Sequence, residues 1–138
     1  METYKEVTIE STVFLAENYI INLLESLALS QLWHWQTKSL GEHKALEEYY
    51  TEVRSKLDSF VEQYQGTRGA SYRLDSKRQI ELAHIQDVDL LIYFEKLLED
   101  TDEVSSQTSK FRILSHLTSQ LDDLKSIISK TTYLLSLK

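Results

Sequence analysis

The fold is decided by the stretch from Trp33 to Gly66, which is WHWQTKSLGEHKALEEYYTEVRSKLDSFVEQYQG. It holds the end of one helical pattern, a break at Ser39–Leu40–Gly41, and a second helical pattern from about Glu42 to Gln65 that Gly66 ends. The apolar residues of the second pattern fall on one side of a 3.6-residue wheel: Leu46, Tyr50, Val53, Leu57, Phe60 and Tyr64. The stretch therefore predicts two amphipathic helices joined by a short turn.

The segment before this turn predicts a long first helix, from about Ile9 to Lys38. Two rows of residues repeat along it with heptad-like spacing. One row is Val13, Ile20, Leu27 and His34, and the other is Phe14, Ile21, Ala28 and Trp35. We expect both rows to face the core.

The segment after Gly66 predicts a polar connector from about Thr67 to Gln86, with a short helix around Lys77–His84, followed by two more helices. The third helix spans about Asp87 to Asp100 and the fourth about Ser106 to Leu137. The fourth has a regular apolar seam: Leu114, Leu117, Leu121, Leu124, Ile128, Thr131 and Leu135. Two helices, a long connector and two helices predict an all-α, ferritin-like four-helix bundle with a long crossover between helices 2 and 3. We expect one domain over residues 1–138.

Composition narrows the chemistry that this bundle can perform. The chain has no cysteine, so a metal would be held by His and carboxylates, a ligand set that suits iron, zinc or manganese. The net charge of −7 argues against DNA binding, and a solvated connector is the preferred interpretation of the basic residues between Gly66 and Gln79. No stretch approaches the roughly 18 uncharged apolar residues of a membrane span, and METYKEVTIE lacks the layout of a secretory signal. We expect a cytoplasmic protein without a membrane segment.

Candidate metal ligands form a stripe along one edge of the second helix. With His43 at zero, Glu47 lies at about 40°, Asp58 at about 60° and Glu62 at about 100° around the helix axis. His34 continues an apolar row of the first helix, so it should face inward and needs a partner or a metal. These five residues are the candidate site, with Fe(II) oxidation at His34, His43, Asp58 and Glu62.

The length of the second helix decides how such a site could form. His43 and Asp58 are fifteen residues apart, which is about 22 Å along a helix, so one metal ion cannot touch both within one chain. A two-fold axis crossing antiparallel copies of this helix would bring His43 of one chain to Asp58 and Glu62 of the other. The alternative is a solvated helix flank beside a hydrogen-bonded core His34.

The segment resembles the Dps family of miniferritins, whose site has a His followed by Trp at the end of the first helix. The family's second helix then carries the pattern His-x3-acid-x10-Asp-x3-Glu. Here these are His34–Trp35 and His43-x3-Glu47-x10-Asp58-x3-Glu62. The resemblance implies that His34, His43, Asp58 and Glu62 hold iron and that Glu47 assists a second iron or a bridging water. It also implies oxidation by peroxide or dioxygen and a dodecameric shell of dimers. The chain is also similar to small ferritin-like proteins encoded by phages.

This sequence departs from the family pattern at three points. The gap between His34 and His43 is three residues shorter, which could displace His34, and position 47 is Glu where the family has Asp. A basic N-terminal tail is missing, since Glu2, Glu6 and Glu10 stand against Lys5.

Four alternatives remain open. One is an intrachain ferritin-type site of Glu17, Glu62 and Asp122 or Asp123. Another is the lone Glu81-x-x-His84 motif, for which chance is the preferred explanation. A third is a bundle that binds metal without oxidising it, and a fourth is a helical interaction or structural protein without metal. His116 is interpreted as a surface residue.

Overall fold

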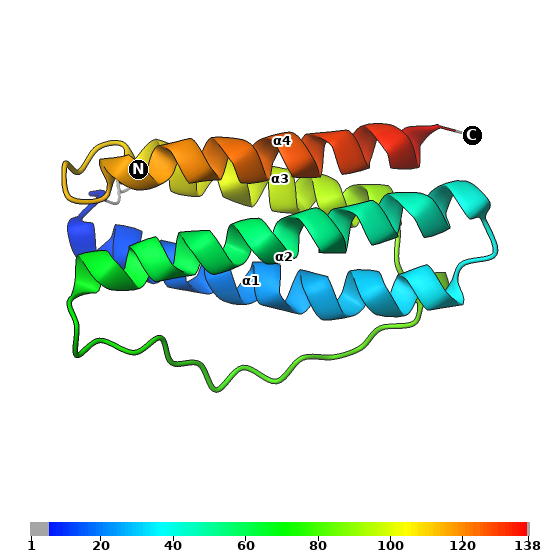
Figure 1. Cartoon of the computed structure of the whole chain (residues 1–138), viewed down its shortest axis with the longest axis horizontal. Coiled ribbons are helices and arrows are strands. Elements are labelled where there is room, and N and C mark those ends of the chain that lie inside the picture. The colour runs from blue at the N-terminus through cyan, green and yellow to red at the C-terminus, as the bar shows by residue number, and fades with distance from the viewer. Residues whose placement is uncertain (1–5, 138) are drawn as a thin grey trace, which may run out of the picture.

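The computed structural model describes residues 6–137 and contains four long helices (Figure 1). These are α1 (Ile9–Gln36), α2 (Leu40–Arg68), α3 (Leu90–Thr108) and α4 (Thr118–Ser136), with short 3-10 turns η1 (Ile85–Asp87) and η2 (Ser115–Leu117). Helices α1 and α3 are neighbours, as are α2 and α4, and two antiparallel hairpins are formed, one by α1 with α2 and the other by α3 with α4. The prediction of an all-α four-helix bundle with a long crossover between the second and third helices is confirmed.

The crossover determines the direction of the second half of the chain. Between α2 and η1 the backbone is extended and runs the length of the bundle outside α1, so α3 starts at the end where α2 starts (Figure 1). The predicted helix around Lys77–His84 is wrong, because this segment has no regular structure. Side chains of α1 hold it instead: Trp33 Nε1 donates to the carbonyl of Ala83 at 2.8 Å, and Arg78 donates to Asn18 and Asn22. Arg78 is therefore bound to α1, in contrast to the solvated connector that we expected.

The core is built from one face of each helix. The seam of α4 is confirmed, with Leu121, Leu124 and Ile128 fully buried. The first row of α1 also points inward, since Val13, Ile20 and His34 are buried. The second row is wrong at both ends: Phe14 is 71% exposed and Trp35 68% exposed. Successive residues on a helix lie about 100° apart, so a row one residue beyond the edge of the buried face points toward solvent.

The largest departures from the predicted helix boundaries lie near the hairpin of α3 and α4, and α2 also continues through Gly66 to Arg68. Helix α3 continues past Asp100 to Thr108, and α4 begins only at Thr118. Thr101 and Thr108 are buried, and their hydroxyls donate to the carbonyls of Leu97 and Val104 at 2.8 Å. These bonds satisfy the polar atoms that make threonine a poor helix residue elsewhere.

Helix α1 also bears on the question of a membrane. Among residues 6–137 it is the one helix long and apolar enough, by length and composition, to cross a membrane, which corrects the expectation that no stretch approaches such a span. Nearly half of its apolar window is buried inside the bundle, as in the core helix of a soluble protein, so the finding is weak support for a span. Glu2 and Lys5, which bear on the missing basic tail, lie outside the described residues.

Candidate metal centre

The turn between α1 and α2 positions two imidazoles side by side. His34 lies in the last turn of α1 and His43 in the first turn of α2, with Thr37–Ser39 between the helices. Ser39 caps α2 by accepting a hydrogen bond from the Glu42 N–H at 3.3 Å. The ring centroids of His34 and His43 are 3.7 Å apart with 20° between their planes, so the rings are stacked. The shortened turn therefore does not displace His34 from His43.

Each of these rings is bonded to the backbone of the other residue. His34 Nδ1 lies 2.7 Å from the carbonyl oxygen of His43, and His43 Nδ1 lies 2.9 Å from the carbonyl oxygen of His34. A carbonyl oxygen can only accept, so each Nδ1 carries the proton. In the neutral imidazoles, Nε2 is then the atom with a free lone pair, which is the form that binds a metal.

Glu47 completes a group of three side chains of one chain that could hold a metal ion. One ligand atom from each of His34, His43 and Glu47 lies within 4.8 Å of the others, and among residues 6–137 no other group of three or more such residues is found. His34 is 8% exposed, His43 half-buried and Glu47 exposed, so the group runs from the core edge to the surface. Two imidazoles and one carboxylate with open positions toward solvent are a ligand set for a divalent transition metal.

Asp58 and Glu62 lie elsewhere on the same chain. Both are exposed on α2, more than two turns beyond Glu47, and neither belongs to the group of three ligands. This agrees with the length argument that one chain cannot bring His43 and Asp58 to one ion. An approach of these carboxylates from a second copy stays a prediction.

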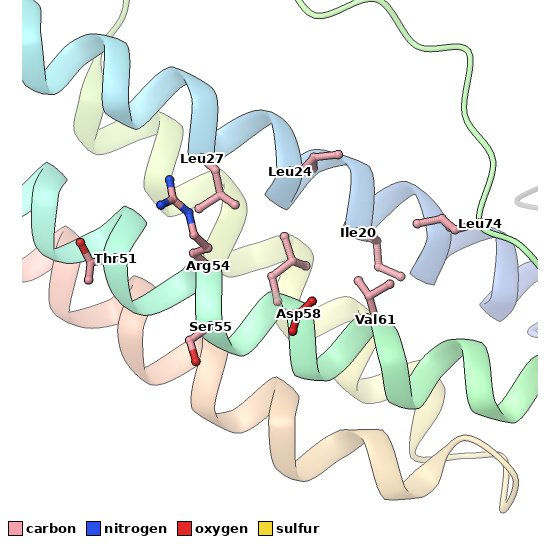
Figure 2. A pocket seen from close by; sticks show the side chains of 10 residues that line it. Ile20, Leu24, Leu27, Thr51, Arg54, Ser55, Asp58, Val61 and Leu74 are labelled. Carbon is pink, nitrogen blue, oxygen red and sulfur yellow. The ribbon is translucent and has the colours of Figure 1, made fainter.

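An apolar groove adjoins Asp58 (Figure 2). It has a volume of about 570 Å³ and lies between α1 and α2, where Ile20 of α1 faces Val61 of α2 and the connector contributes Leu74. Arg54 and Asp58, one turn apart on α2, are its charged lining residues. Leu24 is 50% exposed, so the groove leaves apolar surface in contact with water.

The alternative ligand sets do not assemble. Glu17, Glu62, Asp122 and Asp123 form no metal-competent group among residues 6–137, and Asp123 pairs with Lys56 at 3.3 Å. Glu81 lies on the extended connector, where His84 Nδ1 accepts a hydrogen bond from the Gln86 N–H. His116 is exposed, as expected of a surface residue.

The neighbouring tyrosines Tyr49 and Tyr50 differ in burial, which the apolar pattern of the second helix did not predict. Tyr50 contacts His34 edge-on, with ring centroids 5.6 Å apart, and the guanidinium carbon of Arg54 lies over the Tyr50 ring, 6.0 Å from its centroid. Tyr49 is fully buried, and its hydroxyl is 2.6 Å from that of Ser26. Burial raises the pKa of Tyr49 far above its usual value, so it stays neutral. The spacing of Tyr50 seven residues after His43 is the sequence signal that places it on the same helix edge.

Residues 34–135 match a protein family described as a family of unknown function, DUF5856. The chain belongs to this family. It is also 26% identical over 123 residues to the "uncharacterized 14.6 kDa protein in mobD-ri intergenic region" of Enterobacteria phage T4, a match that covers 89% of each chain. No solved structure matches the chain.

Proposed function

We propose that this protein binds Fe(II) at His34, His43 and Glu47 and oxidises it, as Dps-type miniferritins do. The observation that carries the proposal is the pair of reciprocal hydrogen bonds between the two imidazoles and the two backbone carbonyls. These bonds hold both rings in place with Nδ1 as the donor, in a group where one nitrogen of each ring and one carboxylate oxygen of Glu47 lie within 4.8 Å of one another.

The ligand set supports iron, with zinc or manganese as competitors. Neutral imidazole and carboxylate suit all three ions, zinc has no redox chemistry, and Fe(II) is more readily oxidised than Mn(II) by peroxide or dioxygen. Three ligands from one chain leave coordination positions open for water, an oxidant or further carboxylates. The exposed Glu47 gives the cation a route from solvent.

A second copy would complete the site for oxidation. In this proposal Asp58 and Glu62 of the second copy join His34, His43 and Glu47, which makes a dimer the minimum unit and, by the resemblance, a dodecamer the full assembly. Two Fe(II) ions each give up one electron to hydrogen peroxide, which takes up two protons and leaves as two water molecules. The protein would act in the cytoplasm, as an iron-detoxifying homo-oligomer.

Anaerobic Fe(II) titration followed by addition of peroxide tests this proposal. We expect saturable Fe(II) binding by the wild type and rapid oxidation of the bound iron. The variant E62Q should lose most of the oxidation rate, whereas E52Q, a matched change on the side of α2 that faces Lys130, should retain it. Oxidation that E62Q leaves unchanged, or a protein that takes up no Fe(II), would overturn the proposal.

One observation favours a second candidate, a helical interaction or structural protein without metal. Both imidazoles already have hydrogen-bond partners and stack on one another, so they clamp the α1–α2 turn without any ion. Metal analysis of the purified protein, together with attempted loading by Fe(II), Zn(II) and Mn(II), separates the two. If the folded protein binds none of these ions, the His34–His43 pair serves only to stabilise the α1–α2 turn.

A further inference from the structure

The exposed edge of α2 is complementary to itself when it is turned end for end. The midpoint lies between Tyr50 and Thr51. Three residues outward on either side stand Glu47 and Arg54, an acid and a base. Seven residues outward stand His43 and Asp58, and ten residues outward stand Leu40 and Val61. Each position thus has a partner of matching chemistry at the same distance from the centre.

These residues share one side of the helix. Steps of three, seven and ten residues return to nearly the same direction at about 100° per residue, so the side chains of the set lie within about 60° of each other, with Tyr50 and Thr51 on its borders. Arg54, Glu47 and Asp58 are exposed, Val61 and His43 are half-buried, and Leu40 is 68% exposed. No salt bridge within residues 6–137 involves Arg54, Glu47 or Asp58. The charges of this edge are therefore available to a second molecule.

We infer that the occupant of this face is a second copy of the chain, whose α2 lies antiparallel across the first with Arg54 of each copy paired to Glu47 of the other. An isologous contact of this kind needs a self-complementary surface, which the sequence of pairs about Tyr50–Thr51 supplies. The apolar groove beside Arg54 and Asp58 adds surface that water leaves on association, including the half-exposed Leu24. This inference rests on the proposed function, which supplies the two-fold axis. It adds the register in which the two helices pair, and it names Arg54 as the residue that determines this register.

The register has a consequence for the metal centre. When Glu47 faces Arg54, His43 stands opposite Asp58 of the other copy, so the ion pair aligns the carboxylate with the imidazoles. A shift by one helical turn would place Glu47 against Asp58, two acids, and would leave Arg54 opposite Thr51. Like charges across an interface are unfavourable, so the repulsion between Glu47 and Asp58 disfavours that register, in which Arg54 also loses its acidic partner. Arg54 is thus a positioning residue that acts on the centre of the other copy through Glu47.

A charge exchange between two separate variants tests the inference in chelator-treated protein, where metal plays no part. In an R54E homodimer two carboxylates face each other at both ends of the contact, and in an E47R homodimer two guanidinium groups do. We expect each variant to dimerise at least about tenfold more weakly than wild type by analytical ultracentrifugation, because each loses two ion pairs and gains two repulsions. A mixture of R54E and E47R should form a heterodimer of near wild-type affinity, since both of its contacts then join an acid to a base. K56E makes the same charge change on the side of α2 that faces Asp123 and should dimerise as wild type does.

A wild-type protein that stays monomeric at high concentration overturns the inference, as does a mixture that dimerises no better than its components. Positions 47 and 54 are exposed, so we expect both variants to fold, and circular dichroism of each variant checks that weaker dimerisation is not caused by unfolding. Failure of the proposed function gives a different result. If Fe(II) titration shows no binding while the charge exchange restores the dimer, the interface stands and the metal centre does not.

Discussion

Replacement of His43 by Phe separates the two roles of the imidazole pair. The phenyl ring preserves the shape that stacks on His34 at 3.7 Å, but it removes the Nδ1–H that donates to the His34 carbonyl at 2.9 Å. A net hydrogen bond contributes about 1 kcal/mol, and a partly buried carbonyl without a partner adds to the loss, so we expect a destabilisation of about 1–2 kcal/mol. For a domain of this size the melting temperature should fall by about 3–8 °C.

The same variant reports on the metal centre when Fe(II) is added without oxygen. An ion that binds the folded state stabilises it by about 2.7 kcal/mol at one hundred times its dissociation constant, which would raise the melting temperature of the wild type by about 10 °C. H43F lacks one of the three ligands and should show little of this increase. Differential scanning calorimetry with and without Fe(II) measures both effects, and H116F, which changes an exposed His outside the centre, is the control.

Two results would refute the reasoning. If H43F melts at the wild-type temperature, the hydrogen bond across the turn contributes nothing measurable to stability. If H43F is destabilised as expected but gains as much from Fe(II) as the wild type does, His43 clamps the turn and is not a ligand.

Three further predictions concern the bundle itself. Phe60→Ala should cost about 3–5 kcal/mol in urea unfolding because Phe60 is fully buried, whereas Phe14→Ala, at a side chain that is 71% exposed, should change stability by less than about 0.5 kcal/mol. Comparable losses for both would contradict the burial of the two residues. Stability should decline as pH rises above about 10, since burial raises the pKa of three tyrosines above the value in the unfolded chain and unfolding then releases their protons: Tyr19, Tyr49 and Tyr93. Tyrosinate absorbance that appears in full before the helical circular dichroism is lost would disprove this. Arg78→Ala should accelerate proteolysis within the connector several-fold without a large change in melting temperature, because the guanidinium holds an exposed extended segment to Asn18 and Asn22. An unchanged cleavage rate would mean that the other contacts of the connector suffice.

The sequence predicted the bundle because the apolar residues of α1 and α4 repeat regularly along the faces that are buried in the core. The seam of α4 and the inward row of α1 are both confirmed by burial. The pattern failed at the hairpin between α3 and α4, where a run rich in Ser and Thr forms the end of α3. There the hydroxyls of Thr101 and Thr108 donate hydrogen bonds to carbonyls one turn back. Helix propensities of single residues do not predict these bonds. Tertiary burial overrides weak helix propensity in such segments.

The candidate centre was predictable in part. Position on the helix placed His34 inward and grouped His43 with Glu47, and the structure brings these three residues together. The reciprocal bonds between rings and carbonyls were beyond the reach of a pattern, because they depend on how the ends of α1 and α2 cross at the turn. Asp58 and Glu62 lie outside the centre of one chain, and only a second chain can decide their role.

The extended connector has one more consequence for this molecule. It carries no helix or strand between α2 and η1, and it touches the rest of the protein through a few side chains of α1 and α2. The two helical hairpins hold together through their shared core. The connector therefore stabilises the bundle mainly by lowering the entropy that the two hairpins lose when they associate. A single cut near Ser76 would therefore leave two fragments that recognise each other, and the bundle would become an association of two peptides whose assembly depends on their concentration.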